Sequence, residues 1–514
     1  MKKVLSLIAA CLLTTACSLE ENPNDQITEA DVYTDATSLY KNAVATLYSY
    51  IGGNTDGQGL QGTCRGVYDL QTFGSDEAML PTRGGDWLDG YIWQQMYKHT
   101  WTDGHEIVKN SWIYLYKVIT LCNRSLELLD KYQELLTDDE YQQHWAEVRA
   151  LRAMYYWYLI DLFGRVPLIT SSHIPMNDVE QVERAEVFNF CVQELEEALP
   201  YLAKANSVRP GDYYGRMTLP VAQFVLAKLM LNAEVYTGVA RWQDVIKYCD
   251  DLEQFGFTLE PNYANNFLVH NENSKENIFV IPMDKDLYPN QQQNLYRSYH
   301  YRHAAAYGFT AENGSCATLR ALEIFGYKTD NEDARFADNY YAGIVYDLNN
   351  NIVKDRSGEM LIYLPEFVKY DLSGSKYVET AGARMKKYAV DKNAPNDGKQ
   401  MDNDIVLFRY ADVLLMRAEA KLRSGQDGQA DFDRVRSRSN MGQRPLTLDN
   451  LLDERLLELA WEGWRRQDLI RFDRYETLYV GDDQIDESDG HTKVYPIPAD
   501  VMAVNPRLVQ NKGY

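Results

Sequence analysis

The sequence lacks the features on which several classes of protein depend. Basic residues are outnumbered, 52 Lys and Arg against 75 Asp and Glu, so the formal net charge is −23 over 514 residues. Nucleic-acid binding draws on clustered Lys and Arg, and we therefore expect no nucleic-acid partner. An acidic surface also repels acidic molecules, which favours a neutral ligand.

Cysteine is scarce and irregularly placed. Apart from the two cysteines of the N-terminal segment, the chain contains Cys64, Cys122, Cys191, Cys249 and Cys316. An odd number at wide spacing is neither a disulfide framework nor a zinc site. We expect most of these side chains to be buried as small hydrophobic groups.

Familiar catalytic motifs are missing as well. The eight histidines include no HExxH spacing, and neither a GxSxG motif nor a P-loop occurs. His300 and His303 stand close together without a neighbouring metal motif, and we interpret them as exposed loop residues. "SDEAMLPTRGGD" and "DKDLYPN" carry oxygen ligands without EF-hand spacing, so a structural calcium ion stays open and no other cofactor is predicted.

Long apolar runs are also missing. A membrane span needs about 20 consecutive apolar residues, and no such run occurs. At the N-terminus "MKK", "VLSLIAACLL" and "TTAC" are typical of a secretion signal over residues 1–16. The cysteine at its end indicates a bacterial lipobox, in which Cys17 is lipidated and becomes the first residue. Thr14 departs from the usual aliphatic residue, so a plain signal peptide is the alternative. Residues 17–30 then form a polar tether, and the protein is anchored to a membrane without spanning it.

What is present is strong helical periodicity. "YQQHWAEVRALRAMYYWYLIDLFG" repeats apolar residues at spacings of three and four and ends at Gly164. Residues 218–256 and 404–440 look like helical hairpins broken at Gly238 and Gly425. They resemble tetratricopeptide units, and generic antiparallel helix pairs are the alternative. Between them, residues 51–104 and 256–400 are rich in Gly, Asn, Asp and Tyr, and loops this long usually carry function.

A carboxylate cluster invites comparison with glycosidases. Glu454, Glu458 and Glu462 recur at spacings of four in "ERLLELAWEGWRRQDLIRF". Helix neighbours at this spacing are about 5–6 Å apart at Cβ, which is close to the separation of the two carboxylates in a retaining glycosidase. They stack on one helix face, however, whereas a glycosidase places its two acids across a cleft. The arginines of the same stretch lower carboxylate pKa values, and a general acid needs the opposite shift. We interpret the cluster as structural ion pairing.

One loop stands out, "TRGGDWLDGYIWQQMYKHTWTDG" at residues 82–104. Trp87, Tyr91 and Trp93 lie among glycines, so the rings either pack on the protein's own body or form a platform for a flat ligand such as a sugar ring. The arginine and aspartates of the loop supply hydrogen-bonding groups for hydroxyls. "YKHTW" looks like the start of a helix, which predicts that Trp101 belongs to the core. The residues alone leave packing and binding equally open.

The motifs occur together in one order. A lipobox is followed by "DVYTDATSLYKNAVATLY", "SDEAMLPTRGGDW", "AEVRALRAMYYWYLIDLFGRVPLI", "FRYADVLLMRAEA", "ERLLELAWEGWRRQDLIRF" and "YPIPADVMAVNPRLVQNKGY". This series resembles the SusD/RagB family of outer-membrane lipoproteins from Bacteroidota, over essentially the whole chain after the signal peptide. The resemblance implies a mainly α fold, with four tetratricopeptide-like helix pairs and a loop-rich region with small strands. It implies one such domain over residues 31–514, with helices at about 35–50, 105–255 and 404–475.

The resemblance also implies a function. Family members are not enzymes; they sit on the cell surface, bind glycans and act as a lid over a SusC-like TonB-dependent transporter in carbohydrate uptake. Capture of oligopeptides by the same architecture, as in RagB-like members, is the alternative. Two further hypotheses are a hydrolase, which turnover of a glycan by the pure protein would show, and a scaffold without a small ligand, which ligand binding would exclude.

The ligand site implied by the resemblance lies in the loop-rich region. Trp87 is the first choice for a stacking platform, and Trp93 is left open between stacking and packing. The expected ligand contacts are Trp87, Asp76, Arg83, Asp89, Trp93, Tyr288, Tyr296, Tyr299 and Arg384. "ENGSC", residues 312–316, stands where the family inserts a ligand-facing loop.

Overall fold

The computed structural model describes residues 29–175, 178–288, 290–476, 479–480, 483–484 and 489–514. The secretion signal, Cys17 and most of the tether lie outside the described residues. The part that is described is mainly helical, with short antiparallel strand pairs. This confirms the fold class expected from the sequence.

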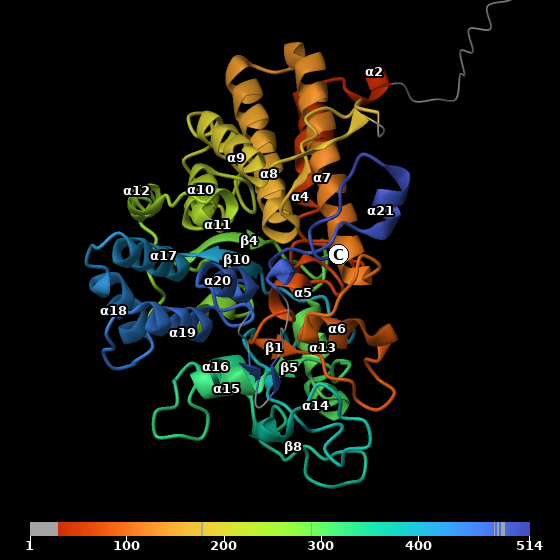
Figure 1. Ribbon diagram of the computed structural model, residues 1–514, viewed down its shortest axis with the longest axis vertical. Helices are drawn as coiled ribbons and strands as arrows, with labels where there is room; N and C mark the ends of the chain where they lie inside the picture. Colours follow the sequence, from red (N-terminus) through yellow and green to blue (C-terminus); the bar gives the residue numbers. More distant parts are fainter. Residues whose placement is uncertain (1–28, 176–177, 289, 477–478, 481–482, 485–488) are drawn as a thin grey trace, which may run out of the picture.

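Two long helices dominate one end of the molecule (Figure 1). α7 (Glu106–Lys131) packs on α8 (Asp138–Phe163). α8 begins in a capping box, because Thr137 accepts a hydrogen bond from the Glu140 N–H while the Glu140 carboxylate accepts one from the Thr137 N–H. It ends at Gly164, whose φ of +71° is the left-handed region that glycine tolerates. The helix predicted from periodicity is thus confirmed.

The predicted hairpins are also present. α10 (Leu219–Leu231) packs against α12 (Trp242–Glu253), and α17 (Tyr410–Arg423) packs against both α12 and α18 (Gln429–Arg438). One boundary differs from the prediction, because Asn232 separates α10 from α11 (Ala233–Thr237). Asn232 has a φ of −99° and a ψ of +10°, outside the helical region, although its N–H still donates to the Lys228 carbonyl oxygen at 3.2 Å. Its side chain donates to the same oxygen at 3.0 Å.

Two further helices pack on those already described: α9 (Arg184–Ala198) on α8, and α19 (Leu448–Leu459) on α17. The other helices outside the loop-rich part are α2 (Glu29–Val32), α3 (Ala36–Tyr40), the π-helical turn Lys41–Ala45, α4 (Thr46–Tyr48), α20 (Arg465–Arg471) and α21 (Ala499–Val504).

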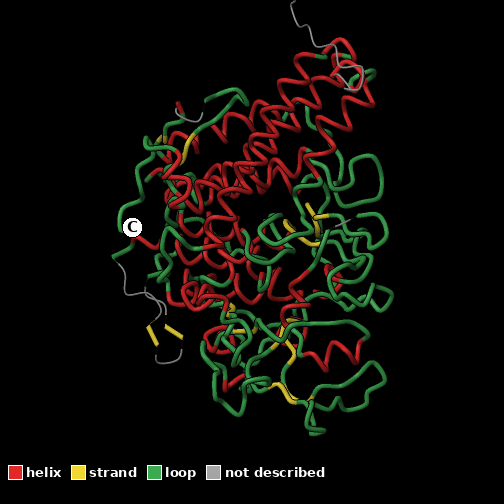
Figure 2. Tube along the Cα trace, turned by 90° about the vertical axis from the view of Figure 1, so that its right-hand side faces the viewer, coloured by secondary structure: helices red, strands yellow, loops and turns green. Residues whose placement is uncertain are grey.

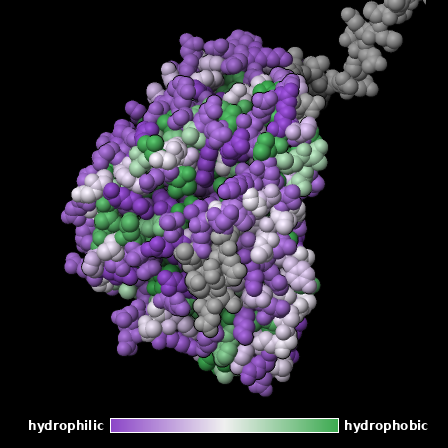
Figure 3. All heavy atoms as spheres, in the orientation of Figure 1, coloured by the Kyte–Doolittle hydropathy of each residue, from purple (hydrophilic) through white to green (hydrophobic). Residues whose placement is uncertain are grey.

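Loops gather along one side and at the end opposite α7 and α8 (Figure 2). The short helices among them are α5 (Val67–Thr72), α6 (Ile92–Lys98), α13 (Gln293–Ser298), α14 (Tyr301–Tyr307), α15 (Leu319–Ile324) and α16 (Phe336–Asn339). Hydrophilic side chains predominate on the face in Figure 3, and the hydrophobic ones form separate small patches. In the described part of the chain, no helix combines the length and apolar character that a membrane span requires.

Strands join these loops to the helices. The longest pair is β4 (Asn277–Ile281) with β10 (Ile405–Arg409), entirely buried beside α10. Two-residue pairs tie other loops together: β1 (Ala78–Met79) with β5 (Cys316–Ala317), β2 (Val166–Pro167) with β3 (Gln181–Val182), β6 (Tyr340–Tyr341) with β9 (Arg384–Met385), β7 (Gly343–Ile344) with β8 (Ile362–Tyr363), and β11 (Tyr479–Val480) with β12 (Asp483–Gln484).

The three glutamates of α19 and the turn after it form a buried ion-pair network. Arg335 bridges Glu454 and Glu458, with both N–O distances 2.8 Å, and Arg409 binds Glu458 and Glu462. Burial by itself raises the pKa of Glu458, but Arg438, Arg409 and Arg335 hold it well below its usual value. The structural interpretation is therefore confirmed.

The partners of those glutamates correct one detail of the prediction. We expected the arginines of the same stretch, and the structure instead brings arginines from distant segments. The nearby arginines serve other acids: Arg455 binds Asp412 and Asp468, Arg465 binds Asp76, Arg466 lies 3.5 Å from Asp161, and Arg471 binds Glu419.

Of the other local predictions, some are confirmed and some are wrong. All five cysteines of the described residues are buried and free, as expected. Trp101 is buried, as predicted, and its Nε1 donates to the Tyr514 hydroxyl at 2.7 Å, although "YKHT" ends α6 instead of starting a helix. His300 and His303 are buried, which corrects the exposed-loop interpretation. They cap and form part of α14, and burial lowers the pKa of His303 to about 3.

Candidate ligand-binding site

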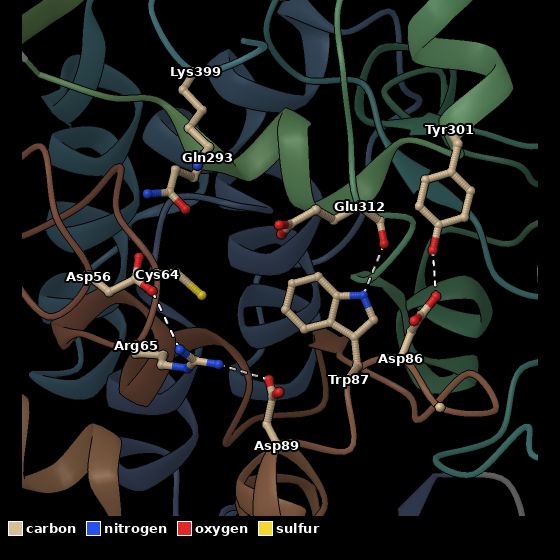
Figure 4. A pocket seen from close by; sticks show the side chains of 11 residues that line it. Asp56, Cys64, Arg65, Asp86, Trp87, Asp89, Gln293, Tyr301, Glu312 and Lys399 are labelled. Atoms are coloured by element: carbon tan, nitrogen blue, oxygen red, sulfur yellow. Dashed lines mark hydrogen bonds and ion pairs between the residues drawn. The ribbon is translucent and has the colours of Figure 1, made fainter.

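A pocket of about 490 Å³ lies among the loops. Its walls come from the first loop-rich segment, from α13 and α14, and from Glu312 and Lys399 further along the chain. The lining residues are Asp56, Cys64, Arg65, Gly85, Asp86, Trp87, Asp89, Gln293, Tyr301, Glu312 and Lys399. Figure 4 shows the Trp87 ring in the middle, with Arg65 on one side, Tyr301 on the other and Glu312 beyond the indole nitrogen. Two of the predicted contacts, Trp87 and Asp89, are brought together here.

A tight loop presents Trp87. The main chains of Arg83 and Asp86 exchange hydrogen bonds at 2.9 and 3.2 Å, and Trp87 follows with a φ of +60°. Asp89 and Tyr91 also have positive φ, +40° and +70°. Non-glycine residues in this region are uncommon and carry conformational strain, which is often found at functional sites.

Contacts on two sides fix the plane of the indole. Trp87 Nε1 donates to the Glu312 carbonyl oxygen at 3.0 Å. Gly314 lies against the ring so closely that a Cβ there would come within 2.5 Å of Trp87 Cε2. The ring is half-buried, so part of it faces the pocket. A ring held in this way is a preorganised surface for a flat ligand.

Trp93 supports the platform from inside. It is 1% exposed, meets Trp87 edge-on at 6.1 Å between ring centroids, and donates from Nε1 to Asp89 Oδ2 at 2.8 Å. The same oxygen accepts from Arg65 Nη2 at 3.0 Å. The question left open for Trp93 is resolved in favour of packing, because no ring face is left for a ligand.

Two tyrosines hold the opposite walls. The Tyr301 hydroxyl donates to Asp86 at 2.6 Å, and the Arg356 guanidinium lies 4.7 Å from the Tyr301 ring centroid. The Tyr296 hydroxyl donates to the Glu312 carboxylate at 3.1 Å, and the Lys399 ammonium lies 4.4 Å from its ring. Tyr296 is half-buried and adjoins the pocket through these two lining residues.

Four predicted contacts are buried elsewhere in hydrogen-bonded or packed positions. Asp76 binds Arg465 through both oxygens, at 2.6 and 2.9 Å. Arg384 donates to the Asn313 side chain at 2.8 Å, and the Tyr299 ring stacks on His303 at 4.5 Å. All three are at most 2% exposed, so they have no surface for a ligand. This corrects the expectation that they face the pocket.

Arg83 is the fourth, and it ties loops together under the platform. Its guanidinium donates to the carbonyl oxygens of Gly314, Val378 and Ala381 at 3.3, 2.8 and 2.9 Å. Burial and the charge of Arg384 lower the pKa of Arg83 to about 9. Arg83 therefore holds these segments together and is not the ligand contact that we predicted. Tyr288 is 42% exposed and does not line the pocket.

Several lining residues escaped the sequence-based prediction. Glu312 opens the "ENGSC" segment, and Gln293 and Tyr301 lie in "YPNQQQNLYRSYHYRH", so both segments carried a signal from the family resemblance. Arg65 and Lys399 had none. Arg65 precedes the aromatic loop and Lys399 lies far beyond it, both in stretches without periodicity, and only the fold brings them to the pocket.

The pocket offers hydrogen bonds and stacking. None of its lining residues is a histidine, and burial raises the pKa of the Cys64 thiol to about 12, so a reactive thiolate is disfavoured. Within the described ranges, no group of three or more His, Cys, Asp or Glu side chains is placed to hold a metal. Calcium binding stays a prediction.

Comparisons with known proteins agree with this architecture. The SusD family matches residues 256–514, and the family described as "Starch-binding associating with outer membrane" matches residues 71–229. The starch-binding protein SusD of Bacteroides thetaiotaomicron is 27% identical over 500 residues, covering 89% of this chain and 87% of that protein. A SusD-like protein of Bacteroides ovatus is 25% identical, covering 92% of this chain and 83% of the relative.

Solved structures share the fold. A laminarin binding SusD-like protein superposes with a TM-score of 0.73 at 23% identity, covering 94% of this chain and 100% of that one. Surface glycan-binding protein A from Bacteroides thetaiotaomicron, in complex with laminarihexaose, gives a TM-score of 0.73 at 20% identity, covering 93% and 100%. With a family match over half of its length and the same helical architecture, the chain belongs to the SusD family.

Proposed function

We propose that the protein is a cell-surface lipoprotein that binds oligosaccharides at the pocket around Trp87. The observation that carries the proposal is the half-buried indole, fixed by Glu312 and Gly314 and surrounded by carboxylates. Sugar rings have apolar faces that stack on such a ring and hydroxyls that donate to carboxylates. The relatives named for binding starch and laminarin support the same class of ligand.

Calorimetry against a panel of purified oligosaccharides tests this proposal. Stacking on one platform with a few hydrogen bonds gives affinities from micromolar to millimolar, about −4 to −8 kcal/mol. Trp87→Ala should weaken binding at least tenfold. The matched control is Trp145→Ala, since Trp145 is also half-buried but lies on α8. Equal affinity in the wild type and the Trp87 variant would remove this pocket from the site.

The pocket is proposed to bind glycans without cleaving them. Its carboxylates accept hydrogen bonds from Tyr296, Tyr301, Arg65 and Trp93, which hold them in place as acceptors. The relatives are named for binding glycans. Incubation of the bound glycan with pure protein should leave it intact. Release of shorter sugars, lost in Glu312→Gln, would contradict this part of the proposal. The names of the relatives do not favour the oligopeptide alternative.

The family supports a place beside a transporter. We propose that the chain is lipidated at Cys17, faces outward on the outer membrane and delivers glycan to a SusC-like TonB-dependent transporter, as its lid. Metabolic labelling with a palmitate analogue should mark the wild type and not Cys17→Ala. Affinity purification from the membrane should recover a barrel protein of that class, and its repeated absence would contradict the partnership.

A further inference from the structure

The charges that line the pocket are unequal. Four carboxylates, Asp56, Asp86, Asp89 and Glu312, face two cations, Arg65 and Lys399. The rest of the molecule offers little compensation, because the whole chain has a formal net charge of −23. This imbalance bears on which glycans the proposed site takes, and the inference below rests on the proposed function.

One of the two cations is already neutralised. Arg65 lies 3.0 Å from Asp89, 3.5 Å from Asp56 and 3.8 Å from Glu106. Three acidic groups around one guanidinium leave no net positive charge for an anionic ligand. An anion that approached Arg65 would have to displace one of these carboxylates.

Lys399 is the other cation. Its ammonium group lies over the Tyr296 ring, and Tyr296 in turn binds the Glu312 carboxylate. No carboxylate of the described residues lies within ion-pair distance of Lys399. It is therefore a single positive charge beside Glu312, at the side of the pocket away from Tyr301 in Figure 4.

Asp86 and Glu312 each keep hydrogen-bonding capacity for a ligand. Asp86 Oδ2 accepts from Tyr301 and Glu312 Oε1 accepts from Tyr296. In the described part of the chain, the second oxygen of each carboxylate accepts no hydrogen bond from the protein. These oxygens lie on either side of the Trp87 platform and suit donors such as sugar hydroxyls.

We infer that the pocket selects uncharged sugar rings and excludes glycans that carry carboxylate or sulfate groups, with Asp86 and Glu312 as the residues that set this specificity. Hydroxyl groups satisfy the free oxygens of both carboxylates. An anionic substituent supplies no donor and meets like charges on both sides of the ring. Specificity of this kind arises from repulsion of the wrong ligand.

A chemically matched series tests the inference. The neutral oligosaccharide that binds in the panel is oxidised at its primary hydroxyls to uronic acids, and part of this product is converted to the methyl ester. Linkage and length are unchanged, and the acid and ester differ mainly in charge. At 20 mM salt the acid should bind at least tenfold more weakly than the ester. The gap should narrow at 0.5 M salt, because screening weakens the repulsion.

A double variant assigns the effect to the two carboxylates. Asp86→Asn with Glu312→Gln keeps the acceptor oxygens for the tyrosines and removes two charges, so the acid-to-ester ratio should shrink at least threefold. The control pair is Glu134→Gln with Asp139→Asn, exposed residues near the tip of the α7–α8 pair. This control removes the same total charge and should leave the ratio unchanged.

The outcomes are distinct. Acid and ester binding equally well to the wild-type protein would overturn the inference while leaving glycan binding intact. A gap that is unchanged in the Asp86 and Glu312 variant, or that shrinks as much in the control pair, would also overturn it, since net charge and not the pocket would be responsible. Absence of binding to every sugar in the panel would instead contradict the proposed function. The wild-type salt series does not depend on the folding of any variant.

Discussion

The indole nitrogen of Trp87 donates a hydrogen bond to the carbonyl oxygen of Glu312, 225 residues further along the chain. The bond uses the only donor of the indole and leaves the ring itself for packing. Gly314 then lies against the ring, two residues beyond Glu312. One short segment thus orients the platform and closes one side of it.

Gly314→Ala should displace the platform without removing it. The new Cβ would lie 2.5 Å from Trp87 Cε2 and 2.8 Å from Leu80 Cδ2, so the ring has to shift. We expect glycan affinity to fall about tenfold and stability by about 1–3 kcal/mol, as in other overpacked sites. Calorimetry and urea denaturation measure the two effects. Gly442→Ala is the control, because nothing lies within 4 Å of its added Cβ; equal affinity in both variants would contradict the prediction.

Tyr301→Phe should loosen the loop that carries Trp87. The variant loses the 2.6 Å hydrogen bond to Asp86, the residue next to Trp87, and keeps the aromatic ring. Hydrogen bonds to charged groups contribute about 1.5–3 kcal/mol, so we expect glycan affinity to fall about five- to tenfold as the loop becomes less ordered. The control is Tyr201→Phe, an exposed tyrosine of the helical part. Wild-type affinity in the Tyr301 variant would show that this bond does not order the site.

Glu458→Gln should destabilise the fold and leave the pocket chemistry unchanged. The substitution removes one charge from a buried network in which Arg335 and Arg409 bind Glu458 at 2.8 and 2.5 Å. Buried cations that lose their partner cost about 3–5 kcal/mol. Urea denaturation should show this loss, whereas Glu323→Gln, which breaks an exposed pair with Arg320, should cost less than about 1 kcal/mol. Comparable stabilities of the two variants would be inconsistent with the network.

Glu77 predicts a pH dependence of stability. Burial raises its pKa from 4.5 to about 8, although the Trp461 N–H donates to it and Lys387 lies nearby. Between pH 4.5 and 8 the folded protein therefore keeps a proton that the unfolded chain has released. The free energy of unfolding should fall across this window as pH rises, by at most about 1.4 kcal/mol per pH unit from this group.

Glu77→Gln isolates that contribution. Glutamine stays neutral at every pH, so the stability of the variant should decline less between pH 5 and 8 than that of the wild type. Urea denaturation at one-unit intervals gives both slopes. Glu323→Gln should reproduce the wild-type slope, and identical slopes for the Glu77 variant and the wild type would refute the assignment.

Local patterns in the sequence predicted the helical framework well. The stop at Gly164 and the breaks at Gly238 and Gly425 are signals carried by neighbouring residues, and the structure ends a helix at or just before each of them. The structural role of Glu458 was also predictable, since acids that stack on one helix face do not flank a cleft, although Glu462 lies beyond the end of α19. Their partners were not, because Arg335 and Arg409 belong to other segments.

Less of the site than of the helical framework could be predicted from the sequence. The aromatic loop was visible in the sequence, but the residues around Trp87 and Trp93 did not show which of the two rings is exposed. In the fold one ring lines the pocket and the other is buried, and Arg83 turns inward to three carbonyl oxygens.

Short-range information therefore encodes where helices begin, end and bury their apolar stripes, because each depends on residues within one or two turns. Which ring faces a ligand depends on Glu312, Gly314 and Tyr301, more than 200 residues away along irregular loops. Such loops have no periodicity from which a direction can be read. Their side chains are oriented by hydrogen bonds that exist only once the distant segments have met.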